Sequence, residues 1–113
     1  MTTEQSTDGV AEFNREIAKI ERTYLGFEDH DILTGFLHVS YGSASQGIGG
    51  YAILDVAGPY IARTLKACGV RSWEQLPGRT IYVLSDRGRR PVGIEPLPTE
   101  RGEGFFFAEV FVP

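Results

Sequence analysis

Alternation of apolar and polar residues is clearest between residues 32 and 41, where it predicts a β-strand. Leu37 and Val39 fall on one face of this strand, and Ile32 and Phe36 fall on the other. A strand with apolar side chains on both faces is typical of the interior of a sheet. We therefore expect this strand to have a neighbour on each side.

The segment before it has a mixed pattern. Val10, Phe13, Ile17 and Ile20 repeat with helical spacing, whereas residues 20–27 are rich in β-branched and aromatic side chains. The pattern predicts a short helix near 9–17 that passes into a strand over about 19–27. Residues 1–8 are polar and are expected to form a flexible tail. The polar run 28–31 predicts a hairpin turn.

Glycines and small residues interrupt the pattern after residue 41. Segment 42–50 holds four glycines in nine residues and is expected to be a loop, followed by a strand over 51–56. A helix over about 59–69 is predicted, with Pro59 in its first position and Gly69 as its stop. Its expected buried stripe consists of Ile61, Leu65 and Cys68.

The last third of the chain returns to strands. Ser72 and Gln75 match a capping box for a single helical turn. Strands are predicted over 79–85, 91–96 and 105–112, with a turn at 86–88 and a polar loop over 99–104. The whole chain, 1–113, is therefore expected to be one α+β domain. It should hold a mainly antiparallel sheet of five to six strands with one main helix (about 59–69) packed on one face.

Composition narrows the functional classes. The 113 residues are 42% hydrophobic and include one cysteine, Cys68, which fits a globular protein of a reducing compartment. No apolar run reaches the ~18 residues of a membrane span, so a cytoplasmic protein without a membrane partner is expected. The net charge of −4 argues against generic nucleic-acid binding, which needs a basic surface. The oligomeric state is left open, and a homodimer is compatible with the sequence.

Two segments are candidates for binding. Glycines in 42–50 allow a ligand to approach the backbone, although the same composition also fits a flexible hairpin connection. Three arginines after Asp86 offer charge-assisted contacts to a phosphate or an acidic partner, although a solvated hairpin tip is the alternative. The candidate binding residues are Tyr41, Ser43, Ser45, Gln46, Tyr51, Arg87, Arg89 and Arg90.

Catalytic and metal-binding patterns are weak. Residues 28–31 place three carboxylates around His30, which suits either a divalent cation or a solvated turn. No second cluster completes a ligand set, so neither a metal nor a cofactor is expected. Pairing across this turn predicts His38 opposite Glu21, and Cys68 is expected to be buried on the helix. No nucleophile–base arrangement is visible, and the chain is not expected to be an enzyme.

Four short segments carry a resemblance to a known group of proteins. They are the runs 20–32 (IERTYLGFEDHDI), 37–42 (LHVSYG), 46–51 (QGIGGY) and 72–78 (SWEQLPG). In this order they resemble a family of short proteins encoded by bacteriophages and prophages. The resemblance covers about residues 17–95 and carries over no site residue.

The resemblance implies a setting rather than a mechanism. Small phage proteins without catalytic motifs commonly act by stoichiometric binding, and the expected role is counter-defence. The target would be a host antiviral system such as CRISPR-Cas, or a signalling nucleotide that the protein sequesters. The alternatives are a binding module in phage DNA metabolism or assembly, and a small nucleotide-handling enzyme that uses segment 42–50. The expected partner is a host protein or complex in the host cytoplasm.

Overall fold

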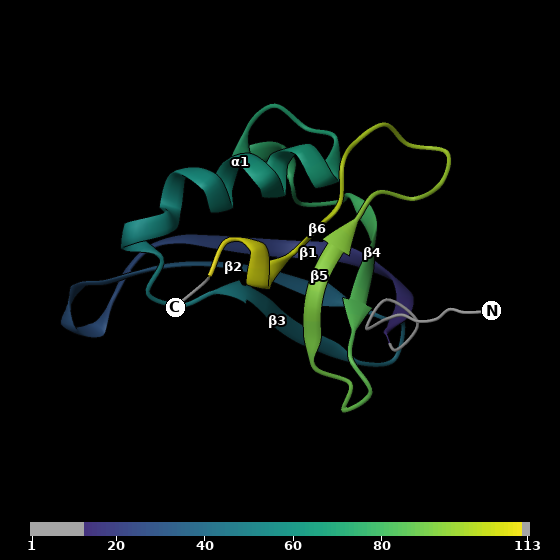
Figure 1. Cartoon of the computed structure of the whole chain (residues 1–113), viewed down its shortest axis with the longest axis horizontal. Helices are drawn as coiled ribbons and strands as arrows, with labels where there is room; N and C mark the ends of the chain where they lie inside the picture. Colours follow the sequence, from purple (N-terminus) through teal and green to yellow (C-terminus); the bar gives the residue numbers. More distant parts are fainter. Residues whose placement is uncertain (1–12, 112–113) are drawn as a thin grey trace.

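The computed structural model describes residues 13–111, which form an antiparallel sheet with an α-helix against it (Figure 1). The strands pair in the order β3-β2-β1-β4-β5-β6. Their bounds are β1 Asn14–Glu28, β2 Ile32–Ser40, β3 Ser45–Gly50, β4 Thr80–Ser85, β5 Pro91–Glu95 and β6 Phe105–Phe106, and helix α1 is Ala57–Cys68. These elements confirm the predicted α+β domain with a six-stranded antiparallel sheet and one main helix. The predicted tail at 1–8 lies outside the described residues.

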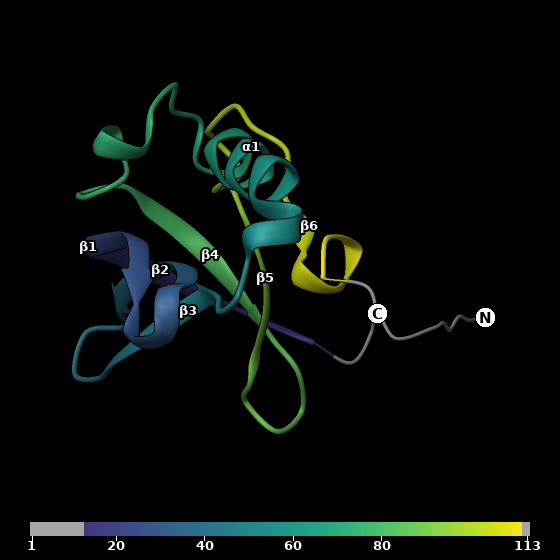
Figure 2. The same cartoon turned by 90° about the vertical axis from the view of Figure 1, so that its left-hand side faces the viewer.

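Strand β1 joins the two halves of the sheet. Residues 14–19 pair with β4, and residues 19–28 pair with β2. The twist that accumulates along a sheet turns β4 and β5 steeply across the direction of β1, β2 and β3 (Figure 1). The sheet therefore has a concave side, and α1 lies over it (Figure 2).

The core fills the space between the concave side of the sheet and α1. Its members include Ile20, Leu37, Val39, Ile48, Ile81, Val83, Ile94 and Phe105 from the strands, and Tyr60, Ala67 and Cys68 from the helix. The Tyr60 side chain is fully buried, and its hydroxyl donates a hydrogen bond to Gly35 O at 2.7 Å. Burial raises the pKa of this phenol above its ordinary value, and the hydrogen bond supplies the partner that a buried hydroxyl requires.

The buried stripe of α1 differs from the predicted one. Tyr60, Thr64 and Ala67 face the core together with Cys68, whereas Ile61 and Leu65 are only partly buried against its edge. The prediction was wrong because it followed the aliphatic residues, while a tyrosine and a threonine carry the inner face. The helix begins at Ala57, so Pro59 occupies its third position, and Gly69 at φ 68° ends it as predicted.

The predicted N-terminal helix is wrong over its described part, because residues 14–17 are the start of β1. Pairing with β4 decides this segment, since Ala18 is buried opposite Ile81 while Ile17 points to solvent. A register shift between Ile20 and Arg22 then changes which residues face the core. The remaining predicted helical residues lie outside the described residues.

The glycine-rich segment is largely a strand, which corrects both the loop predicted at 42–50 and the strand predicted at 51–56. Residues 45–50 form β3 on the edge of the sheet beside β2, and residues 54–56 form a short 3-10 turn. Glycine suits this strand because α1 packs closely behind it. A Cβ atom at Gly49 would overlap the Tyr60 hydroxyl and lie 2.7 Å from Gly35 O.

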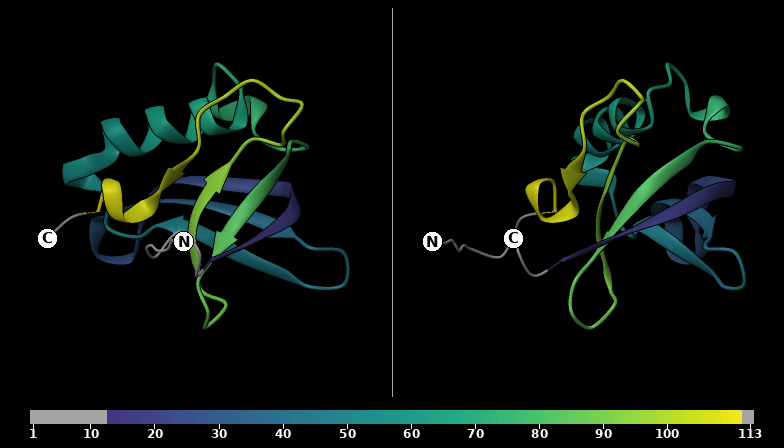
Figure 3. Two further views of the ribbon diagram at one scale, coloured as in Figure 1. Left: turned by 45° about the vertical axis from the view of Figure 1, so that its right-hand side comes forward. Right: turned by 90° about the vertical axis from the view of Figure 1, so that its right-hand side faces the viewer.

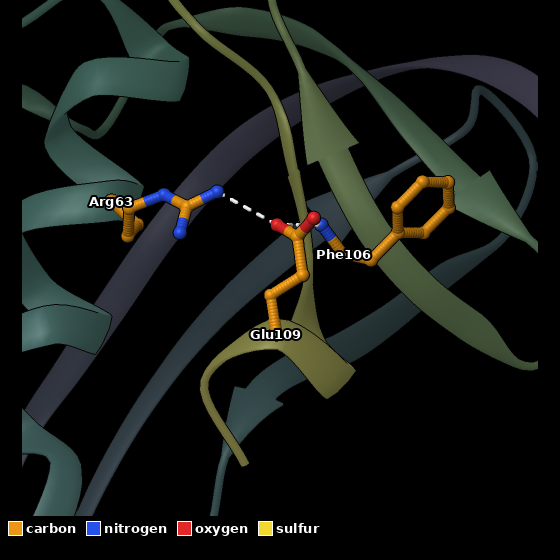
Figure 4. Close-up of polar contacts among 3 residues, drawn as sticks. All are labelled: Arg63, Phe106 and Glu109. Atoms are coloured by element: carbon orange, nitrogen blue, oxygen red, sulfur yellow. Dashed lines mark hydrogen bonds and ion pairs between the residues drawn. The ribbon is translucent and has the colours of Figure 1, made fainter. Parts of the chain in front are cut away.

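The chain after β5 passes the C-terminal end of α1 and then runs back beside the helix toward its first turns. Loop 96–104 arches beside the C-terminal end of α1 (Figure 3), where Glu103 N–H donates to Lys66 O at 3.1 Å. The predicted final strand 105–112 is wrong beyond β6, since Phe107–Glu109 form a 3-10 turn. Arg63 Nη2 lies 2.7 Å from Glu109 Oε1, which also accepts the Phe106 N–H (Figure 4). This contact fastens the C-terminal segment to α1.

Candidate functional site

Five of the predicted binding residues meet in one hollow. This serine–arginine hollow has a volume of about 420 Å³ and is lined by Glu16, Tyr41, Ser43, Ala44, Ser45, Gln46 and Arg89. It forms because the β2–β3 and β4–β5 connections lie at the same end of the sheet, on either side of β1. Tyr41 Oη donates a 2.9 Å hydrogen bond to Gln46 Oε1. Partial burial, with the Glu16 carboxylate nearby, raises the pKa of Tyr41.

Arg87 and Arg90 line a second hollow on the other side of the same turn, together with Phe13, Val92 and Phe106. Arg90 is held by Asp86, which accepts its backbone N–H at 2.9 Å and its Nε at 3.2 Å. These bonds, the backbone one first, lower the pKa of the Asp86 carboxyl. The arginine turn therefore presents its guanidinium groups to two different surfaces.

Tyr51 lies at the opposite end of the molecule. It borders an open hollow of about 600 Å³ at the tip of the β1–β2 hairpin. We call this the aromatic hollow, and its lining consists of Tyr24, Phe27, Glu28, Asp29, His30 and Tyr51. The predicted site is thus divided, and Tyr51 lies with the end of β1 and with the turn 28–31, for which the sequence suggests either a divalent cation or a solvated turn.

Exposed apolar surface is concentrated around the aromatic hollow. Six large apolar side chains are exposed among the described residues, and only Ile17 lies away from this end. The others are Tyr24, Leu25, Phe27, Tyr51 and Leu54, of which Phe27 is 60% and Tyr51 59% exposed. Leu54 belongs here because Ile53 N–H donates to Leu33 O, and Leu33 pairs with Phe27. Exposed apolar side chains gathered at one end of a molecule mark an interaction surface more often than side chains that are exposed singly.

These apolar side chains are exposed because strand β1 is longer than helix α1, which packs over the sheet. Strand β1 has fifteen residues and follows a path of about 45 Å, whereas the twelve residues of α1 cover about 18 Å. In Figure 1 the β1–β2 turn projects beyond the first turn of α1. Leu25 and Phe27 continue the inward-facing row of β1 past the point where the helix covers it.

The turns beside the hollow contain non-glycine residues at positive φ. His30, Asp31 and Ala52 have φ angles of 65°, 58° and 57°. Aspartate and histidine adopt this left-handed region more readily than most residues, whereas alanine rarely does, so the strain is expected mainly at Ala52, at a cost of about 1 kcal/mol or more. Such strain is concentrated at functional sites in many proteins.

Ala52 offers a direct measure of this strain. We expect Ala52→Gly to raise the free energy of unfolding by about 0.5 kcal/mol, because glycine removes the steric cost while adding some unfolded-state entropy. The matched control is Ala62→Gly on the exposed side of α1, which should lower stability by about 1 kcal/mol. Urea denaturation of both variants provides the measurement, and a loss at position 52 would show that its turn is unstrained.

Two other reactive residues, His38 and Cys68, lie outside the linings of these hollows. His38 lies opposite Arg22 rather than opposite the predicted Glu21, because the register shift moves the pairing by one residue. Cys68 is buried as predicted, and burial raises the pKa of its thiol to about 12. Within residues 13–111, no group of three His, Cys, Asp or Glu side chains is arranged to hold a metal ion.

Comparison of the chain with protein-family models, curated proteins and solved structures gave no match. None of the helices in the described part of the chain is long and apolar enough to cross a membrane.

Tyr24 and Phe27 are the functional candidates that sequence reasoning missed. A signal for Phe27 exists in the alternation of Leu25 and Phe27, which stays apolar up to the polar turn. An inward-facing row that ends in phenylalanine beside four polar residues indicates either buried core or a contact surface. The length of the helix, which the sequence pattern estimates well, is what distinguishes the two.

Proposed function

We propose that this protein acts by stoichiometric binding to a protein partner, without turnover, and that the aromatic hollow is its contact surface. The observation that carries the proposal is the exposure of Phe27 and Tyr51 beside Leu25 and Leu54 at one end of the molecule. Aromatic anchors supply most of the binding energy at protein interfaces. An adjoining polar rim, here Glu28 and Asp29, is the usual surrounding of such anchors.

The biological setting of the proposal comes from the resemblance to phage and prophage proteins. On this basis, we propose that the partner is a component of a host antiviral system, such as a CRISPR-Cas complex in the host cytoplasm. A binding module in phage DNA metabolism or assembly would use the same surface and would differ in its partner.

A second candidate is the sequestration of a signalling nucleotide in the serine–arginine hollow. The Arg89 guanidinium and the Ser43 and Ser45 side chains favour it, because they suit phosphate and ribose oxygens. Two observations weigh against it. Residues 45–50 are engaged in strand pairing, so the backbone there is less available than a loop would be, and Glu16 adds a negative charge to the hollow.

Phage plaquing on defended hosts tests the proposal. Wild-type protein is expressed in strains that each carry one antiviral system and are infected with a phage which that system restricts. We expect the wild-type chain to restore plaquing in at least one strain and the double variant Phe27→Ser/Tyr51→Ser to fail. Loss of an aromatic anchor costs about 2 kcal/mol or more of binding free energy.

Ile17→Ser is the matched control, because it also removes an exposed apolar side chain but lies away from the hollow. It should restore plaquing like the wild type, and all variants should keep the wild-type melting temperature. Restoration by the double variant would exclude the aromatic hollow. If Arg89→Glu fails while the double variant succeeds, nucleotide binding is favoured instead. Restoration in none of the strains contradicts counter-defence.

A further inference from the structure

Twice in the described residues, an arginine is held between an aromatic ring and a carboxylate. The Arg63 guanidinium carbon lies 5.0 Å from the centre of the Phe105 ring. Its Nη2 also pairs with Glu109, and Figure 4 shows this ion pair. The Arg15 guanidinium carbon lies 5.0 Å from the centre of the Phe13 ring, and its Nε pairs with Glu95. Each arrangement combines a cation–π contact with a charge-assisted hydrogen bond.

The aromatic hollow contains the same parts without an arginine. Its rings come from Tyr24, Phe27 and Tyr51, and its carboxylates come from Glu28 and Asp29. No ion pair between residues 13 and 111 engages either carboxylate. Tyr24 is held in place, because its hydroxyl donates a 2.7 Å hydrogen bond to Phe27 O.

We propose that the aromatic hollow receives an arginine side chain from a basic surface of the partner. This inference rests on the proposed function and names the chemistry of its partner. A guanidinium group stacks on an aromatic face and offers paired N–H donors to a carboxylate, whereas a lysine ammonium is a compact and strongly hydrated charge. The volume of about 600 Å³ admits one such side chain together with its neighbours.

Charge decides between a basic and an apolar partner. A purely apolar surface would remove Glu28 and Asp29 from water without giving them a counter-charge, which is costly. A basic surface neutralises them as it covers the rings. The net charge of −4 acts in the same direction, because it draws a basic partner toward the protein before contact.

Binding of a defined peptide tests the inference on the isolated full chain. The probe is Gly-Arg-Gly-Arg-Gly, and the control peptide carries citrulline in place of arginine, which keeps the shape and removes the charge. Two-dimensional NMR follows the ring signals of Tyr24, Phe27 and Tyr51 during each titration. We expect saturable shifts of these signals with the arginine peptide and none with the citrulline peptide. The affinity for the arginine peptide should fall as salt is added.

Two double variants isolate the carboxylates. Glu28→Gln/Asp29→Asn should weaken binding of the arginine peptide by about tenfold or more, because a charge-assisted hydrogen bond is lost. Glu74→Gln/Glu103→Gln removes the same net charge from exposed positions elsewhere and should bind like the wild type. Equal weakening by both variants would show that only the overall charge matters and would overturn the site.

Two other outcomes also overturn the inference. One is equal binding of the arginine and citrulline peptides. The other is self-association of the chain that Arg89→Glu abolishes, since the arginine would then come from a second copy. The peptide titration involves no host factor and therefore tests the inference separately from the proposed function. If the arginine peptide does not bind but plaquing still depends on Phe27 and Tyr51, the proposed function stands and only the arginine inference is rejected. Peptide binding without restored plaquing would support the site and contradict the proposed role.

Discussion

Gly49→Ala is expected to lower the free energy of unfolding by about 3–5 kcal/mol, because overpacking and backbone strain add at this position. The added Cβ would overlap the hydroxyl of Tyr60 and lie 2.7 Å from Gly35 O. It would also have to occupy a φ of +124°, which side chains rarely adopt. Relief would require Tyr60 to abandon its hydrogen bond to Gly35, and with it the contact between α1 and the sheet. Urea denaturation followed by circular dichroism measures the loss.

Substitutions at two further glycines separate the effect of overpacking from the effect of backbone strain. Gly42 has a φ of +93° with open space around it, so Gly42→Ala should cost only about 1 kcal/mol from the backbone. Gly58 lies in the first turns of α1 with no neighbour near its Cβ position, so Gly58→Ala should leave stability unchanged or raise it by about 0.5 kcal/mol. If Gly49→Ala cost no more than Gly42→Ala, the close packing of Tyr60 against β3 would be disproved.

Alkaline pH should destabilise the protein through Cys68. Burial raises the pKa of its thiol from 9.0 to about 12, and nearby Arg79 opposes the shift only partly. Between these values the unfolded chain loses the thiol proton while the folded chain keeps it. The contribution of this thiol to the free energy of unfolding is therefore fully present below pH 9. It falls by up to about 1.4 kcal/mol per pH unit between pH 9 and pH 12.

The matched variant is Cys68→Ala, which has no thiol to titrate. Urea denaturation from pH 8 to pH 10 compares the two proteins. The buried Tyr60 phenol, whose pKa is also raised, should likewise lower stability at alkaline pH, but mostly above this range. We expect the wild type to lose stability above pH 9 more steeply than Cys68→Ala. Parallel curves would mean that the thiol reaches solvent in the folded state.

Strand β2 and the turns of the β1–β2 and β4–β5 hairpins were predictable because their signals are local. Alternation over 32–40 and the polar turn at 28–31 gave their positions to within a residue. Strand β3 was not, because its glycines look like loop residues in isolation. What makes Gly49 and Gly50 strand residues is the pairing with Phe36 and Gly35, which no pattern near residue 50 contains.

The candidate sites show the same division between local and long-range information. Arg89 and the serines at 43 and 45 were recognisable by residue type, but their meeting depends on β1 lying between the two connections. The separation of Tyr51 from them also follows from the direction of β3, which carries the chain from one end of the sheet to the other. Tyr24 and Phe27 were overlooked because an apolar residue in a strand is normally assigned to the core.

The part of β1 that extends beyond α1 separates the proposed contact surface from the core, so substitutions in one need not affect the other. Phe27 and Tyr51 are mostly in water, so exchanging them changes stability by little, as surface substitutions usually do. Tyr60 and Cys68, by contrast, are buried in the core, where substitutions usually lower stability. Under the proposed function, a lineage with this architecture would change its target by substitutions at the hairpin tip, while the same core keeps the chain folded.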